Sequence, residues 1–145
     1  NDNLEAAENF SRAAIEEPRW TRFVKERDSA RLTLAEVTLS RADECIERAR
    51  AAQTSVADAE RLAHETLNRV VAARKLFAQL QKLSRPELLN DTTFWIEFLA
   101  HRRLSEIGVV ADRPRHWQLA RQALEALPPQ SLYHNQAKKE LEALP

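Results

Sequence analysis

Small and apolar residues recur with a seven-residue period between Ala35 and Leu80. Two such series, offset by three positions, run through this stretch without a strongly charged residue. The first series is Ala35, Ala42, Ala49, Val56, Ala63, Val70 and Phe77, and the second is Thr38, Cys45, Ala52, Ala59, Thr66, Ala73 and Leu80. This spacing is the a/d pattern of α-helices that pack along one another. The stretch therefore predicts a long, heptad-patterned, coiled-coil-like element.

Most residues of this seam are small, and this determines how it packs. Alanine buries little apolar area, so an alanine-rich seam depends on the close approach of a partner helix over a long distance. Leucines beside the seam widen the apolar face, which indicates more than one packing neighbour. We expect the interaction seam to comprise Ala35, Ala42, Cys45, Ala49, Ala52, Val56, Ala59, Ala63, Val70, Ala73, Phe77 and Leu80. The partner helix belongs either to this chain or to a second one.

The seam lies either on one continuous helix or on the two arms of a helical hairpin. No Pro or Gly occurs between Pro18 and Pro86, and the heptad phase passes through the middle without a slip. Both observations favour a continuous helix, which would make the molecule a rod. The internal break candidate is the segment 53–55, where Ser55 and Asp58 have the spacing of a capping pair. A hairpin near Thr54 is therefore the alternative.

Shorter helices are predicted on both sides of the long element. Pro18 ends an N-terminal helix or opens the next one, and Trp20 and Phe23 belong to an apolar patch just after it. The long element stops at Ser84, before Pro86. We therefore expect one helical domain over residues 1–145, in which residues 1–84 hold the N-terminal helix and the long element.

Residues 87–145 are predicted to form a three-helix C-terminal part. Asp91 is expected to cap a helix that ends at Gly108 in a left-handed conformation. Asp112, with Pro114 in the following first turn, starts the next helix, and Ser131 caps the last one. The fold class that follows is all-α, with a long alanine-rich helix or helical hairpin and a small C-terminal helical bundle.

The composition supports an all-α fold. The chain has 145 residues and a single glycine, and 43% of its residues are hydrophobic. Scarce glycine means few tight hairpins, which makes a sheet built on them improbable. No apolar run approaches the roughly 20 residues of a membrane span. Because the sequence starts at Asn1 rather than Met, we expect a processed protein or an excised piece.

The overall charge is balanced, with 22 basic and 22 acidic residues. A generic nucleic-acid or membrane-surface binder needs a basic excess, so neither partner is expected. One segment around Gly108 is nevertheless rich in basic residues. Its candidate anion-binding residues are Arg102, Arg103, Arg113, Arg115 and His116. Guanidinium groups beside a helix N-terminus are suited to an anionic ligand.

The sequence gives little indication of a metal site, a reactive cysteine or a catalytic site. The four histidines are scattered, without HxxxH, HExxH or paired-cysteine spacing, so no metal site is expected. Cys45 lies among alanines and is expected to behave as a small buried hydrophobe. No nucleophile elbow or glycine-rich loop occurs, so we expect no catalytic residues and no cofactor.

These observations lead to two functional hypotheses. The first is a non-enzymatic protein-interaction or scaffolding module, in which helix–helix packing joins the chain to a protein partner or to a second copy. The alternative is a ligand-sensing helical bundle, extracytoplasmic in one version, that uses the arginine-rich segment as an anion site. The small-residue seam favours the first hypothesis.

Overall fold

The computed structural model describes residues 2–18 and 23–145, and these residues form helices without a β-strand. Trp20, part of the apolar patch expected after the first helix, lies outside the described residues. In chain order the elements are α1 Asp2–Glu16, α2 Val24–Arg50, α3 Val56–Ala78, α4 Glu87–Ile107, the 3-10 turn η2 Val110–Asp112, α5 Arg113–Glu125 and α6 His134–Ala143. The all-α fold class is thus confirmed.

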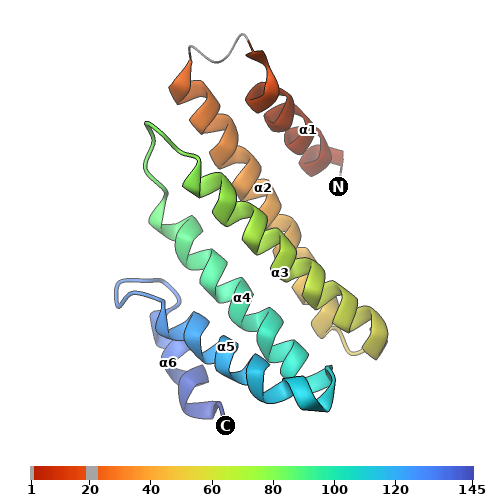
Figure 1. The fold of residues 1–145 in the computed structure, drawn as a ribbon. Helices are drawn as coiled ribbons and strands as arrows, with labels where there is room; N and C mark the ends of the chain where they lie inside the picture. Colours follow the sequence, from red (N-terminus) through yellow and green to blue (C-terminus); the bar gives the residue numbers. More distant parts are fainter. Residues whose placement is uncertain (1, 19–22) are drawn as a thin grey trace.

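The helices run alongside one another with successive helices antiparallel (Figure 1). Helices α2, α3 and α4 all contact one another, and the α2–α3 contact is the most extensive in the molecule. Helix α1 packs on α2, α5 packs on α4, and α6 packs on α5. Among the described helices, none combines the length and the apolar character that crossing a bilayer requires.

The long heptad element is a hairpin, so the expectation of a continuous helix was wrong. Helix α2 ends at Arg50, and α3 begins at Val56. The Thr54 hydroxyl donates to the Arg48 carbonyl oxygen at 2.6 Å, which ties the turn to the end of α2. The Ser55 hydroxyl accepts from the Asp58 amide and donates to the Asp58 carboxylate, which caps α3 as the spacing predicted. The long element therefore turns back on itself and does not form a rod.

The uninterrupted heptad phase did not identify the hairpin, for a geometric reason. In a hairpin each arm needs an apolar stripe facing the other arm, and the number of residues in the turn is free. A turn of residues 51–55 happens to keep both stripes on one seven-residue count. Phase continuity therefore could not distinguish one helix from two.

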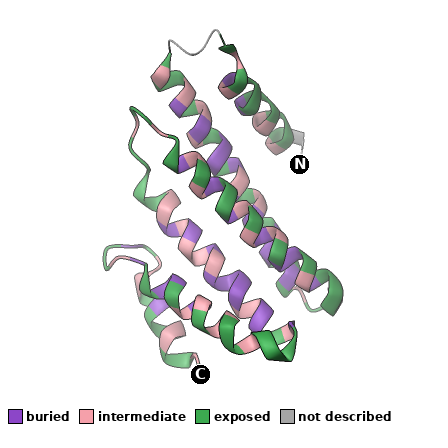
Figure 2. Cartoon of the chain, viewed as in Figure 1, coloured by how far each residue is buried: buried purple, intermediate pink, exposed green. Residues whose placement is uncertain are grey.

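The core follows the helix contacts (Figure 2). One cluster of buried residues extends from α2 through α3 and α4 to α5 and α6, and includes Ile46, Leu62, Phe98 and Leu124. A second cluster joins α2, α3 and α4 around Leu39 and Val70. Every helix of the α2–α6 array thus contributes to buried apolar packing, which is the dominant stabilising force.

A buried carboxylate holds the α3–α4 loop in place. Asp28 in the second turn of α2 is fully buried, and its Oδ2 accepts the amide N–H groups of Gln81, Lys82 and Leu83 at 2.6–3.0 Å. Arg31 donates to Oδ1 at 2.9 Å. These three amides follow the end of α3 at Ala78, so the helix ends earlier than Ser84, where the sequence placed its stop.

Two predicted helix starts differ from the structure. Helix α4 begins at Glu87 after Pro86, so Asp91 lies inside the helix and is buried. Tyr133 precedes α6, and Ser131 instead accepts from the Tyr133 amide within the preceding turn. Asp91 therefore lies four residues inside α4, and Ser131 lies three residues before the start of α6.

Gly108 does follow α4, but in an extended conformation with φ −70° and ψ −179°. Its role is close approach, because a Cβ here would lie 2.6 Å from the Leu104 carbonyl oxygen. By contrast, Asp112 precedes α5 with Pro114 in the first turn, as predicted.

Candidate functional site

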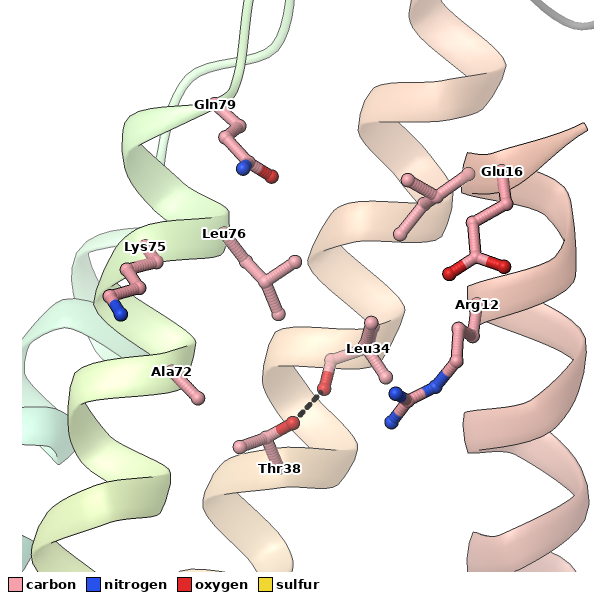
Figure 3. A pocket seen from close by; sticks show the side chains of 9 residues that line it. Arg12, Glu16, Leu34, Thr38, Ala72, Lys75, Leu76 and Gln79 are labelled. Carbon is pink, nitrogen blue, oxygen red and sulfur yellow. Dashed lines mark hydrogen bonds between the residues drawn. The ribbon is translucent and has the colours of Figure 1, made fainter. Parts of the chain in front are cut away.

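A groove between α1 and α3, with α2 as its floor, is the main candidate site (Figure 3). Its volume is 320 Å³, at the lower end of the range for ligand pockets, about 300–1,000 Å³. The apolar part is formed by Ile15 from α1, Leu34 from α2, and Ala72 and Leu76 from α3. The groove therefore offers an apolar surface that three helices contribute.

The groove exists because α1 reaches α2 without packing closely on α3. Small residues mediate this attachment: Ser11 and Ala14 of α1 are buried, which lets the two backbones approach closely. An ion pair between Glu8 and Arg41 at 3.0 Å adds a polar link between α1 and α2. With α1 fixed on one side of α2 and α3 on the other, the space between them stays open.

Polar side chains line the rim of the groove. Arg12 and Glu16 extend from α1, Lys75 belongs to α3, and Gln79 directly follows α3 (Figure 3). Arg12 is paired with Glu8 at 2.7 Å. Among the described residues, neither Glu16 nor Lys75 has an ion-pair partner. Within the described part of the chain, the rim thus presents an acid on the α1 side and a base on the α3 side, neither of them in an ion pair.

The residues of the predicted seam lie mostly inside the hairpin. The buried ones are Ala35, Ala42, Cys45 and Ala49 of α2 and Ala59, Ala63, Val70, Ala73 and Phe77 of α3. Ala52 and Val56, at the turn, are exposed, and Leu80 is half-buried after α3. The helix that covers most of this seam thus belongs to the same chain.

Cys45 lies at the α2–α3 contact and is 7% exposed. Burial raises the pKa of the Cys45 thiol, and the nearby Glu65 carboxylate raises it further. The thiolate is the reactive form of cysteine, so this environment disfavours nucleophilic chemistry at Cys45.

The predicted anion-binding residues separate into two groups. Arg102 and Arg103 line a 180 Å³ pocket together with Arg50 from the end of α2, a residue that the sequence did not suggest. Each guanidinium already has a partner: Arg50 binds Glu47, Arg102 binds Glu140, and Arg103 binds Glu106 and the Ala49 carbonyl oxygen. Arg50 falls 52 positions before Arg102 in a different helix, so no local sequence signal connects them.

Arg113, Arg115 and His116 lie at the start of α5 and do not line this pocket. Arg113 donates to the Gly108 carbonyl oxygen at 3.1 Å and so closes the turn between α4 and α5. Arg115 is exposed. His116 makes a different contact, with its Nδ1 3.1 Å from Nδ1 of His101.

The His101–His116 pair links α4 to α5, and sequence reasoning missed it. His101 is 7% exposed, and its burial lowers the pKa to about 4, with His116, His64 and Arg115 contributing and Glu97 opposing. Burial also lowers the pKa of His116. Both rings are therefore neutral at pH 7, and one Nδ1–H donates to the other Nδ1.

The histidines do not complete a metal site in the described chain. The His64 ring lies 6.5 Å from that of His116, centroid to centroid. Within residues 2–18 and 23–145, no three His, Cys, Asp or Glu side chains are grouped so that they could hold a metal ion.

Comparison with protein-family models, with curated proteins and with solved structures found no significant match to this chain. The candidate function must therefore be argued from the groove and its surroundings.

Proposed function

We propose that this chain is a non-enzymatic protein-interaction module that binds an amphipathic helix of a partner protein in the groove between α1 and α3. The observation that carries the proposal is the apolar lining of this groove, to which Leu34, Leu76 and Ile15 contribute. Helix-in-groove recognition is a common way for helical proteins to bind peptides.

The shape of the groove favours a helix over a compact ligand. Its α3 side is formed by Ala72, Lys75, Leu76 and Gln79, which follow the i, i+3, i+4, i+7 pattern of one helix face. Seven positions correspond to about 10 Å along the helix axis, or two turns. A strip of this length, apolar at Ala72 and Leu76, suits one or two anchor side chains of a partner helix.

The rim charges support an orientation for this helix. A basic residue on the side of the partner that faces α1 would meet Glu16, and an acidic residue on the side that faces α3 would meet Lys75. Such pairs add specificity and association rate more than affinity. Most of the binding energy would come from burying apolar side chains in the groove.

The test uses a phage-displayed library of amphipathic helical peptides and two matched variants of α3. Ala72→Arg introduces a large side chain into the groove from an exposed position. Val71→Arg is the control, because Val71 is the adjacent residue, is 50% exposed and does not line the groove. Selected peptides should bind the parent and Val71→Arg equally well and bind Ala72→Arg at least about tenfold more weakly. Circular dichroism melting checks that both variants fold.

Two results would contradict the proposal. One is a library that yields no binder, or binders that tolerate Ala72→Arg. The other comes from analytical ultracentrifugation: if the parent dimerises and Ala72→Arg makes it monomeric, the groove holds a second copy rather than a separate protein. That result would support self-association, the other version of the interaction hypothesis.

A second candidate function is the sensing of a small anion. The pocket lined by Arg50, Arg102 and Arg103 supports it, because three guanidinium groups suit an oxyanion. The ligand would have to compete with Glu47, Glu140 and Glu106, which already pair with the three arginines, so we rank this function second. Phosphate, sulfate and citrate should raise the melting temperature of the parent and of Arg115→Gln but not of Arg50→Gln. If none of the three anions stabilises the parent, this candidate fails.

A further inference from the structure

A further pocket, of 240 Å³, lies between α2, α4 and the residues that lead into α6. It shares no lining residue with the groove, because it uses a different side of α2. Its apolar part includes Leu39 and Ile96, which are 2% and 1% exposed. The pocket therefore has a rigid base within the core.

One wall of this pocket is aromatic. The Trp95 indole and the Tyr133 phenol are stacked nearly parallel, with centroids 5.2 Å apart and planes at 7°. The Tyr133 hydroxyl hydrogen-bonds to the Thr92 hydroxyl at 3.2 Å, and the Trp95 ring also packs against Phe98. These contacts fix both rings, so the wall is formed before any ligand arrives.

The charged residues of the pocket are two acids. Glu36 and Asp43 both belong to α2 and line the pocket, and they are seven positions apart, so they project from the same face of the helix. Among the described residues, neither has an ion-pair partner, although many other acids of this chain do. The pocket thus combines two uncompensated carboxylates with aromatic rings and an apolar base.

The surroundings of Asp43 disfavour the ionised form of its carboxyl group. Partial burial raises the pKa of the Asp43 carboxyl, and the neighbouring Glu47 and Glu44 raise it further against the effect of Arg50. A raised pKa means that the ionised carboxylate is held in an unfavourable environment. A cation placed in the pocket would reverse this effect.

We propose that this pocket binds an organic cation on a short apolar arm, that is, an alkylammonium or alkylguanidinium group. The carboxylates of Glu36 and Asp43 would neutralise the head group, and the rings of Trp95 and Tyr133 would attract it through their π-electron density. The methylene arm would lie on the apolar base formed by Leu39 and Ile96. The site is independent of the proposed helix-binding groove.

The cation has two possible sources, a free amine and a basic side chain of a peptide. The probes are therefore n-butylammonium, n-butylguanidinium and a lysine capped as N-acetyl and N-methylamide, with n-butanol as the neutral comparison. Binding is followed by NMR through the Trp95 indole N–H resonance. Dissociation constants on the order of millimolar are expected for ligands with so few atoms. If capped lysine binds more tightly than n-butylammonium, the natural ligand is a peptide side chain. If n-butylammonium binds more tightly, the natural ligand is a free amine.

Three variants test the carboxylates. Asp43→Asn and Glu36→Gln, both at exposed positions, should each weaken cation binding about tenfold. Glu26→Gln is the matched control, because Glu26 is an exposed acid of α2 that does not line the pocket. It should change binding less than about twofold.

Three outcomes would overturn the proposal. The first is the absence of saturable shifts of the Trp95 resonance with any of the cations at tens of millimolar. The second is equal binding of n-butanol, which would indicate a purely apolar pocket. The third is unchanged cation binding in both Asp43→Asn and Glu36→Gln.

Discussion

Asp28 shows how one residue can connect distant parts of a helical chain. Its carboxylate lies in α2, yet it accepts three consecutive amides that are more than 50 positions away in the sequence. Those amides belong to the loop after α3, where they have no helical partner. A charged acceptor serves this purpose well, since hydrogen bonds to ionised groups are the stronger ones.

Replacing this carboxylate should therefore destabilise the fold. We expect Asp28→Asn to lower the free energy of unfolding by about 2–4 kcal/mol, because the amide has one acceptor oxygen and leaves Arg31 without its charge partner. Urea denaturation at pH 7 measures this difference. Glu125→Gln, at an exposed position of α5, should change stability by less than about 0.5 kcal/mol. Equal stability of Asp28→Asn and the parent would contradict this role.

The behaviour of Asp28 in acid follows from the same contacts. Burial by itself raises the pKa of Asp28, but the amides of Lys82, Leu83 and Gln81, together with Arg31, outweigh it and lower the pKa from 3.8 to about 2. The folded state thus binds the proton more weakly than the unfolded state. The stabilisation is complete above pH 3.8 and is lost as the pH falls toward 2.

At the scale of elements, the sequence predicted helix boundaries that depend on nearby residues. It did not predict those that depend on contacts with a distant helix. Pro18, the Ser55–Asp58 pair and Asp112 with Pro114 marked helix boundaries, because each acts on its own backbone. The end of α3 at Ala78 was not readable, since it depends on Asp28 in another helix. A distant partner leaves no trace in local spacing.

The candidate sites illustrate the same limit. The heptad seam was visible as a pattern, but the pattern does not state whether α3 or another chain covers α2. The groove was hidden, because Leu34 and Leu76 read only as a wider apolar face. The pairing of Trp95 with Tyr133 requires the loop before α6 to fold back on α4, which no periodicity encodes.

For the whole molecule, the way in which the outer helices pack on the central ones determines where pockets form. Helices α2, α3 and α4 form the central unit of the described chain, while α1 packs mainly on α2 and α6 mainly on α5. Openings occur where this outer packing is incomplete, as beside α1 and next to the residues before α6. A layered helical array thus creates binding surfaces without special loops.

The attachment of α5 to α4 contains a group that makes the whole fold sensitive to pH. His101 of α4 faces His116 and Arg115 of α5, and His64 of α3 lies close by. Protonating His101 in the folded state would place a charge in a buried site among other basic groups, with Glu97 as the opposing acid. The pKa of about 4, compared with 6.5 for an exposed imidazole, reflects this cost.

The sign of the pH effect follows from this lowered pKa. The unfolded chain takes up the proton first, so the contribution of His101 is complete above pH 6.5 and is lost as the pH falls from 6.5 to about 4. The difference between the two pKa values corresponds to about 3 kcal/mol as an upper figure. Urea denaturation of the parent between pH 7.5 and about 4 should show this loss, above the range in which Asp28 acts.

Two variants identify the group responsible. His101→Leu should have a flatter dependence of unfolding free energy on pH between 6.5 and about 4, whatever its stability at pH 7, because the titrating ring is absent. His134→Asn, in the first turn of α6, should retain the slope of the parent. A parent that is equally stable at pH 7 and pH 5 would contradict this role of His101. Because α5 packs on α4, weakening of this contact in acid should loosen α5 from α4, which faster amide hydrogen exchange of α5 at pH 5 would show.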